Sequence, residues 1–254
     1  MNTTFDFRLI ELDGPLSQQV QAVWSASVSI HSEPVTKPLF SDGASGAFII
    51  LKGEVIYHDQ TYKQGVHWIP VKKQAQFITM SAGLEMVGFR FQAGISKNSV
   101  SVFQNVSTSS QNKNHNTNAV DKLQDALVHI KQADRLSFLC DWLQQHIQQA
   151  TPSNALLNFI RRINHKTEIQ GIEKHTPLSL RQIERQFKSQ IGLTPKYYQR
   201  LIRVKTAIGF IRQCPTINLV DLATEAGFSD QAHMNREFRM LAGMTPKEYQ
   251  VSKQ

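Results

Sequence analysis

The stretch LVDLATEAGFSDQAHMNREFRMLAGMTPKEY, residues 219–249, decides how the C-terminal part of this chain folds. Asn218 stands directly before a helical pattern of apolar residues, where its side chain can cap the first turn. Gly227 then permits a tight turn, because glycine adopts backbone conformations that other residues avoid. Ser229 or Asp230 can cap a second helix after the turn. The stretch therefore predicts two short helices joined by a tight turn.

The second of these helices is predicted to run from Gln231 to about Leu241 and to carry polar groups outward. Met234 and Phe238 are one turn apart, so together with Leu241 they mark the inward face. Two short helices joined by a glycine turn are typical of a helix-turn-helix unit, whose second helix enters the major groove of DNA. Amide and guanidinium groups can form paired hydrogen bonds with base edges there. The outward residues are Gln231, His233, Asn235, Arg236 and Arg239.

An internal repeat indicates that this unit has an earlier copy in the chain. FKSQIGLTPKYY at 187–198 aligns with FRMLAGMTPKEY at 238–249, at an offset of 51 residues. Six identical residues coincide, and Arg185 aligns with Arg236 at the same offset. Chance agreement on this scale within so short a segment is improbable, so the repeat predicts a duplicated structural unit.

In the earlier copy, Ser179 can cap the second helix, with Gln182 three residues later in the position of a capping box. The helix before it is less regular, because Gly171 lies in its middle. Between the copies, Tyr197–Arg212 predicts one long helix that would hold the two units at a fixed separation. The outward residues of the capped helix are Arg181, Gln182, Glu184, Arg185 and Lys188.

The excess of basic residues belongs to this repeat-containing part. The chain has 254 residues and a formal net charge of +8, from 28 Lys and Arg against 20 Asp and Glu. Residues 155–254 hold 16 basic and 8 acidic side chains, whereas the preceding residues hold 12 of each. A basic domain beside a neutral one is typical of a protein that binds a polyanion such as nucleic acid.

These residues resemble the AraC/XylS family of bacterial transcription regulators over about Ala155–Val251, through the turn glycine, the inward aromatic residues and the repeated Gly-x-Thr-Pro. The resemblance implies a sequence-specific regulator with helix-turn-helix units at about 168–191 and 219–242. Ala232 offers no hydrogen bond, so it could contact only a thymine methyl group. The base-reading positions implied are Arg181, Gln182, Glu184 and Arg185 in the first unit, and Gln231, Ala232, His233, Asn235 and Arg236 in the second.

Residues 1–106 are rich in short runs of β-branched and aromatic residues. GAFIILKGEVIYH at 46–58 predicts a hairpin, because a Lys-Gly break divides a β-branched run. VHWIPV at 66–71, QFITMS at 76–81 and LEMVGFRFQ at 84–92 follow at short spacing, which favours a small barrel or a sandwich. KPLFSDGASGAFIIL at 37–51 and VGFRFQAGI at 87–95, followed by two predicted helices, resemble, more weakly, the sensory domain of one AraC subgroup. This resemblance implies effector sensing or dimerisation.

The expected fold class is α+β, with three segments in chain order. A strand-rich sensory domain, barrel-like or cupin-like, covers 1–106, and a polar linker with a helical connector covers 107–153. An all-α DNA-binding domain, with its two units joined by the long helix, covers 154–252. The apolar stripes that predict the connector helices are Val120, Leu123, Leu127 and Ile130, then Leu136, Leu139, Leu143 and Ile147.

An enzyme is the competing function class. A metal-dependent cupin fused to a DNA-binding module would need clustered ligands, whereas His31, His58 and His67 are isolated in the sequence. A DNA-repair methyltransferase would need a cysteine cluster near the N-terminus, whereas the first cysteine is Cys140. We therefore expect no catalytic residue, no metal and no cofactor.

The expected partners follow from the charge and from the resemblance. Double-stranded DNA, contacted in the major groove, is the main partner; RNA polymerase, an unidentified small-molecule effector and a second copy of the chain are further candidates. No run approaches the length of a membrane span, so no membrane contact is expected. The start MNTTFDFRLIELDGP lacks the layout of a signal peptide, and two cysteines fit a reducing compartment, so the expected location is the cytoplasm.

Overall fold

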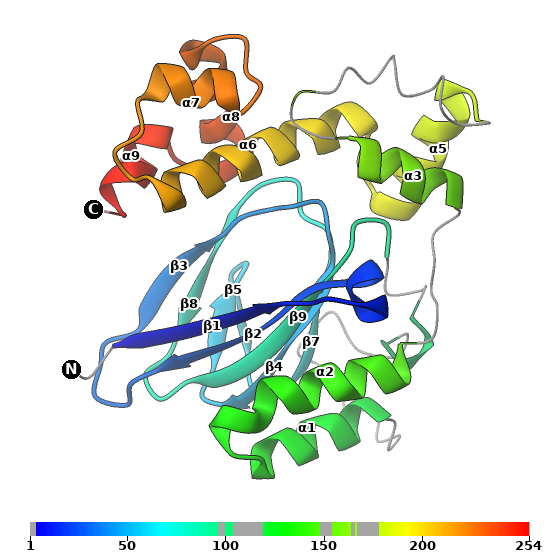
Figure 1. The fold of residues 1–254 in the computed structure, drawn as a ribbon. Coiled ribbons are helices and arrows are strands. Elements are labelled where there is room, and N and C mark those ends of the chain that lie inside the picture. Colours follow the sequence, from blue (N-terminus) through cyan, green and yellow to red (C-terminus); the bar gives the residue numbers. More distant parts are fainter. Residues whose placement is uncertain are drawn as a thin grey trace. The chain divides into compact units, whose positions relative to one another are not determined.

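The chain folds into two compact units, shown in Figure 1. The computed structural model describes residues 4–95, 100–103, 119–147, 154–163, 166 and 178–253. The first unit comprises residues 1–37, 44–70 and 77–151, and the second comprises 38–43, 71–76 and 152–254. Strands dominate the first unit and helices the second, which confirms the expected α+β class.

The strands of the first unit form two sheets. The larger has the order β1-β2-β9-β4-β7, and the smaller has the order β3-β8-β5-β6. The pairings of β2 with β1 and β9, and of β4 with β9 and β7, are antiparallel. The bounds are β1 (Phe5–Glu11), β2 (Val20–Val28), β3 (Val35–Leu39), β4 (Gly46–Lys52), β5 (Val55–Tyr57), β6 (Gln60–Tyr62), β7 (Gly65–Ile69), β8 (Gln76–Met80) and β9 (Glu85–Phe91).

The hairpin predicted over 46–58 is wrong, because β4 and β5 belong to different sheets. Strand β4 pairs with β9 along one edge and with β7 along the other, so neither edge remains for β5. Gly53, with a φ of 80°, lies between the two strands. Beyond it β5 pairs with β6 and β8 instead. The Lys-Gly break therefore marks a change of sheet.

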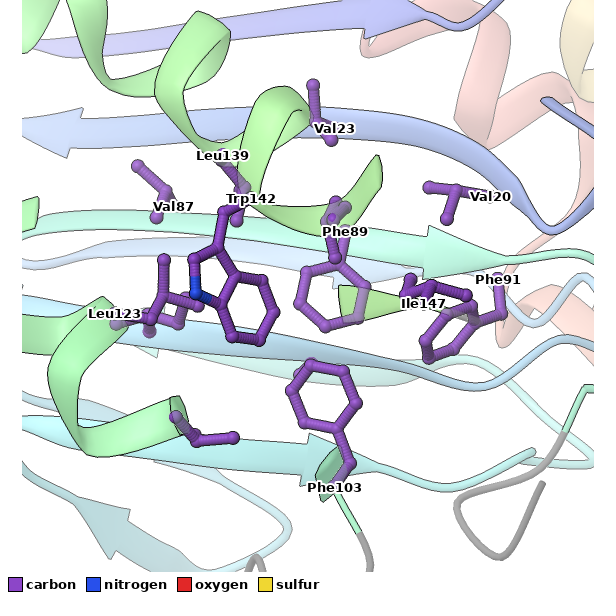
Figure 2. Close-up of a cluster of buried hydrophobic side chains, with 14 of the residues drawn as sticks. Val20, Val23, Val87, Phe89, Phe91, Phe103, Leu123, Leu139, Trp142 and Ile147 are labelled. Carbon is purple, nitrogen blue, oxygen red and sulfur yellow. The ribbon is translucent and has the colours of Figure 1, made fainter. Parts of the chain in front are cut away.

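Helices α1 (Ala119–His129) and α2 (Arg135–His146) pack against one face of the larger sheet. The two predicted apolar stripes are buried there, apart from Ile130, which is half-buried. Figure 2 shows the Trp142 indole among Phe89, Phe103 and Leu123 in the resulting core. Short 3-10 helices complete the unit: η1 (Pro15–Gln18), η3 (Ser101–Phe103) and η4 (Gln132–Asp134).

One ion pair fixes α2 to the larger sheet. The Arg135 guanidinium donates to Glu85 Oε2 of β9 at 2.7 Å. Its Nε also donates to the backbone carbonyls of Leu127 and Ile130, each at 3.2 Å. The carbonyl of Leu127 belongs to α1, so one buried arginine connects both helices and the sheet. This matters because a buried charge is stable only where partners satisfy it.

The described helices of the second unit follow the order that the sequence predicts, whereas the helix expected around Gly171 lies outside the described residues. They are α3 (Asn154–Arg162), α5 (Leu180–Ile191), α6 (Pro195–Gln213), α7 (Leu219–Glu225), α8 (Gln231–Ala242) and α9 (Pro246–Val251). The long helix expected over 197–212 is confirmed as α6, which begins two residues earlier at Pro195. Its predicted inward stripe, Leu201, Val204, Ile208 and Ile211, is buried. No described helix of the chain is both long and apolar enough to cross a membrane.

Candidate nucleic-acid interface

Helix α8 begins and ends at the residues that the sequence marks. Asp230 is the N-cap, and its side chain accepts a hydrogen bond from the backbone N–H of His233 at 2.6 Å. This bond, and then the hydroxyl of Ser229, hold the pKa of the Asp230 carboxyl below its ordinary value. Gly243 ends the helix in the left-handed conformation, with a φ of 74°. Of the two candidate caps, Asp230 is therefore the one used.

Helix α5 has the same construction 51 residues earlier. Ser179 is the N-cap, and the predicted capping box is present. The Oε1 atom of Gln182 accepts from the backbone N–H of Ser179 at 2.9 Å, and Ser179 Oγ accepts from the N–H of Gln182 at 3.4 Å. Gly192 ends the helix with a φ of 81°. The carbonyl oxygen of Gln182 thus serves the cap, and its amide nitrogen is the group that remains to face a ligand.

Each helix rests on one buried aromatic side chain. Phe187 of α5 packs edge-to-face against Phe159 of α3 and Tyr198 of α6, with ring centroids 5.9 Å and 5.5 Å apart. Phe238 of α8, its counterpart in the repeat, packs against Tyr249 of α9 at 6.1 Å. Both phenylalanines are fully buried, which fixes the opposite face of each helix toward solvent.

The structure places the predicted site residues on the solvent side of these helices. The positions expected on α5 are all exposed: Arg181, Gln182, Glu184, Arg185 and Lys188. On α8 three residues are exposed, namely Ala232, Arg236 and Arg239, and three are half-buried, namely Gln231, His233 and Asn235. Contact of any of these side chains with a base or a phosphate stays a prediction.

Among these side chains, His233 is held by its own surroundings. Its Nδ1 lies 3.0 Å from Ser229 Oγ, in the turn before α8. Its ring packs edge-to-face on Phe228 with the centroids 5.5 Å apart. Its Nε2 lies 3.8 Å from Glu237 Oε1, one turn further along the helix. The imidazole therefore has a defined orientation before any ligand arrives.

Sequence reasoning missed Glu237, which connects α8 to the long helix. Its Oε2 accepts from Arg200 Nε at 2.6 Å, and both side chains are largely buried, 13% and 23% exposed. Burial lowers the pKa of the Arg203 guanidinium, and the Glu237 carboxylate opposes that change. A polar residue recurs at this position in both copies, Gln186 and Glu237. That recurrence was the available signal.

The metal-enzyme alternative concerns the three histidines of the first unit. His31 and His58 are exposed, and His67 is half-buried. Burial lowers the pKa of His67, against the opposing effect of a hydrogen bond with the Lys63 carbonyl at 2.7 Å. Within the residues that the structure describes, no group of three or more His, Cys, Asp or Glu is placed to hold a metal ion.

Comparison with known proteins gives a family match for the second unit. Residues 172–252 match a family described as a helix-turn-helix domain. The HTH-type transcriptional activator RhaS of Escherichia coli strain SE11 is 30% identical over 116 residues, which are 46% of this chain and 36% of RhaS. The same activator from strain K12 / DH10B gives the same identity and coverage. The match thus covers only 36% of the length of these curated relatives.

Two groups of solved structures show weaker likeness. The crystal structure of ToxT from Vibrio cholerae O395 has a TM-score of 0.47 and 13% identity, over 98% of this chain and 97% of ToxT. A variant of the oxalate decarboxylase of Bacillus subtilis has a TM-score of 0.29 and 12% identity, over 39% of this chain and 28% of the decarboxylase.

Proposed function

We propose that this chain is a sequence-specific, DNA-binding transcription regulator of the AraC/XylS family. Residues 172–252 match a family described as a helix-turn-helix domain, which supports the proposal. Its curated relatives are transcription activators, although the match covers only 36% of their length. The proposal therefore concerns DNA binding first. It contains no catalytic step, and the cytoplasm is the location that it requires.

The observation that carries the proposal is the equivalence of α5 and α8. Each begins at a side-chain cap, ends at a left-handed glycine and rests on a buried phenylalanine. Each also exposes two arginines: Arg181 and Arg185 on α5, and Arg236 and Arg239 on α8. Two copies of one basic helix surface suit a repeated polyanion such as duplex DNA.

The two helices divide the contacts unequally in this proposal. We assign base contacts to Arg181, the Gln182 amide, Glu184 and Arg185 on α5, and to Gln231, Ala232, His233, Asn235 and Arg236 on α8. Guanidinium and amide groups suit the edges of guanine and adenine, and the Ala232 methyl suits thymine. Lys188 and Arg239 lie near the C-terminal ends of their helices, and we assign them to phosphates.

The long helix sets the spacing of the two contacts. Helix α6 has 19 residues, which corresponds to about 28 Å at 1.5 Å per residue. Successive major-groove segments on one face of B-DNA are about 34 Å apart. Both α5 and α8 pack against this helix, α5 at Tyr198 and α8 at Arg200. We therefore expect the two helices to enter adjacent segments, and the binding site to have two parts about one helical turn apart.

Further partners belong to the same proposal. The strand-rich first unit would supply effector sensing, dimerisation or both, and RNA polymerase would be contacted at the promoter. A DNA-binding protein that senses no effector differs from this proposal only in what its first unit does. Neither version requires a metal or a cofactor.

Selection of bound DNA from the source genome tests the proposed function. Purified full-length chain is incubated with sheared genomic DNA, and the retained fragments are sequenced. We expect a shared motif with two parts, enriched upstream of genes. A control with Arg185→Ala and Arg236→Ala combined should lose the enrichment. Retained fragments without a common sequence would contradict the proposal.

A further inference from the structure

A pocket of about 360 Å³ lies between the two helices of the first unit. Ala119, Lys122 and Leu123 of α1 line one side, and Phe138, Trp142 and His146 of α2 line the other. The three α2 residues recur every fourth position, so they form one continuous ridge along the helix. The volume is at the lower end of the range for pockets that bind small molecules.

The floor and one wall of this pocket are apolar and rigid. Leu123 and Trp142 are buried, 1% and 7% exposed, in the core beneath the pocket (Figure 2). The Trp142 indole packs on Phe103 with ring centroids 5.9 Å apart. Phe138, half-buried, packs against the same core. A flat apolar ligand would therefore meet a surface that is already ordered, which lowers the entropy cost of binding.

One polar group of the wall is oriented in advance. The His146 ring stacks on the Trp142 indole, with centroids 4.3 Å apart and planes inclined by 11°. Its Nδ1 lies 2.9 Å from the Trp142 carbonyl oxygen, and must donate to it because a carbonyl can only accept. The imidazole is thus fixed in orientation and tautomer, and Nε2 is the ring atom left to meet a ligand.

The charge of the described lining is positive. Lys122 is exposed and is the one fully charged side chain among the lining residues, which include no aspartate or glutamate. Ala119 is the first residue of α1, so the positive end of the helix dipole lies at the same side. These features favour an anionic group next to an apolar body.

We propose that this pocket binds a small organic anion with a flat aromatic body, such as an aromatic carboxylate. The ring lies against Phe138 and Trp142, and the acid group meets Lys122. This deepens the proposed function by placing the effector between α1 and α2. The binding step itself needs no DNA.

The test uses 1-anilinonaphthalene-8-sulfonate, a fluorescent aromatic anion, with the full-length chain. We expect saturable binding of one equivalent, with energy transfer from tryptophan. Lys122→Glu should weaken binding about tenfold, because it replaces a charge-assisted contact by repulsion. Lys131→Glu is the matched control, since this exposed lysine lies outside the lining, and it should bind as the unaltered chain does. Equal affinities of the two variants, or no saturable binding, would overturn the proposal.

A pocket-filling variant separates binding in this pocket from binding elsewhere. Ala119→Phe adds a ring inside the lining without removing a core side chain, and should abolish dye binding while the melting temperature is kept. If sedimentation shows that Ala119→Phe or Lys122→Glu instead dissociates a dimer that never binds the dye, the pocket is a subunit contact and the proposal fails.

DNA binding distinguishes this failure from failure of the proposed function. None of the three substituted residues belongs to α5 or α8, so all variants should still bind the DNA motif. Dye binding that responds to the variants in a chain without DNA affinity would uphold the pocket and refute the regulator. A chain that binds the DNA motif but not the dye would uphold the regulator and refute the pocket.

Discussion

Glu237 of α8 accepts a hydrogen bond of 2.6 Å from Arg200 of α6. This pair fixes a proposed DNA-reading helix to the long helix that joins the two helix-turn-helix repeats. The same carboxylate lies 3.8 Å from His233 Nε2. Arg200 also packs over the Tyr197 ring at 4.9 Å. The position of α8, and the orientation of one proposed base contact, thus depend on one acidic side chain.

Replacement of Glu237 tests this dependence. Glu237→Gln leaves Arg200 without its charged partner in a largely buried place, and should cost about 1–3 kcal/mol of local stability in α8. Hydrogen exchange of the α8 amides in the full-length chain measures the cost. The matched control is Glu225→Gln, which removes a 3.2 Å pair with Lys166 that is more than half exposed. Its effect should stay within about 0.5 kcal/mol, and equal effects of the two substitutions would contradict our interpretation of the pair.

Acid should loosen the start of α8. Hydrogen bonds from His233 N–H and Ser229 hold the pKa of Asp230 below its ordinary value, so folding favours the charged carboxyl. This contribution is complete above the pKa of the unfolded chain, about 4, and is lost as the pH falls through the lower folded pKa. Amide protection in the first turn of α8 should therefore decrease in that range.

Asp230→Ser provides the comparison, because serine caps a helix without titrating. In this variant, the amide protection of the first turn of α8 should not change over the pH range in which Asp230 of the unaltered chain titrates. If the variant loses protection at the same pH as the unaltered chain, another group causes the change. Glu248 is the group to consider next, since its pKa is lowered by its hydrogen bond with the Thr245 backbone at the cap of α9.

The stability of the first unit should depend strongly on Arg135. Arg135→Met removes the 2.7 Å contact with Glu85 and the bonds to two carbonyls, and should destabilise this unit by about 2–4 kcal/mol. Tryptophan fluorescence during urea unfolding reports on this unit, because all three tryptophans belong to it. Arg8→Met, which breaks an exposed pair with Asp6, is the control and should change little. A loss below about 1 kcal/mol for Arg135→Met would contradict the prediction.

The second unit was largely predictable because its signals are local. Caps at Ser179, Asn218 and Asp230 act within three residues, and left-handed glycines end α5 and α8. Apolar residues at helical spacing then predicted which face of each helix is buried. Such features depend on neighbours in sequence, which a sequence displays directly.

Strand pairing and Glu237 were not predictable, because they depend on distant residues. The run at 46–58 has the local pattern of a hairpin, yet β7 and β9, both later in the chain, occupy the two edges of β4. Strand β1, an edge strand paired with β2, drew no prediction of its own. The partner of Glu237 is 37 residues away, so its burial follows from how α6 packs on α8. The limits of the three expected domains, and the DNA contacts, stay predictions.

Lys188 should act through phosphates alone. Lys188→Ala should weaken binding to every duplex alike, and should lower the slope of log affinity against log salt by about one ion. Fluorescence anisotropy at several salt concentrations measures both effects. Lys52→Ala, an exposed lysine of the first unit, is the control and should leave the slope unchanged. A loss confined to the specific duplex would show that Lys188 reads bases.

The most direct test of the account compares Arg236→Ala with the unaltered chain on the selected motif and on a scrambled duplex. We predict that the unaltered chain prefers the motif, and that Arg236→Ala loses about 1–3 kcal/mol on the motif and little on the scrambled duplex. Arg185→Ala, at the equivalent position of α5, should behave in the same way. Equal losses on both duplexes would make Arg236 a phosphate contact. Equal affinity of the unaltered chain for the two duplexes would contradict sequence-specific recognition itself.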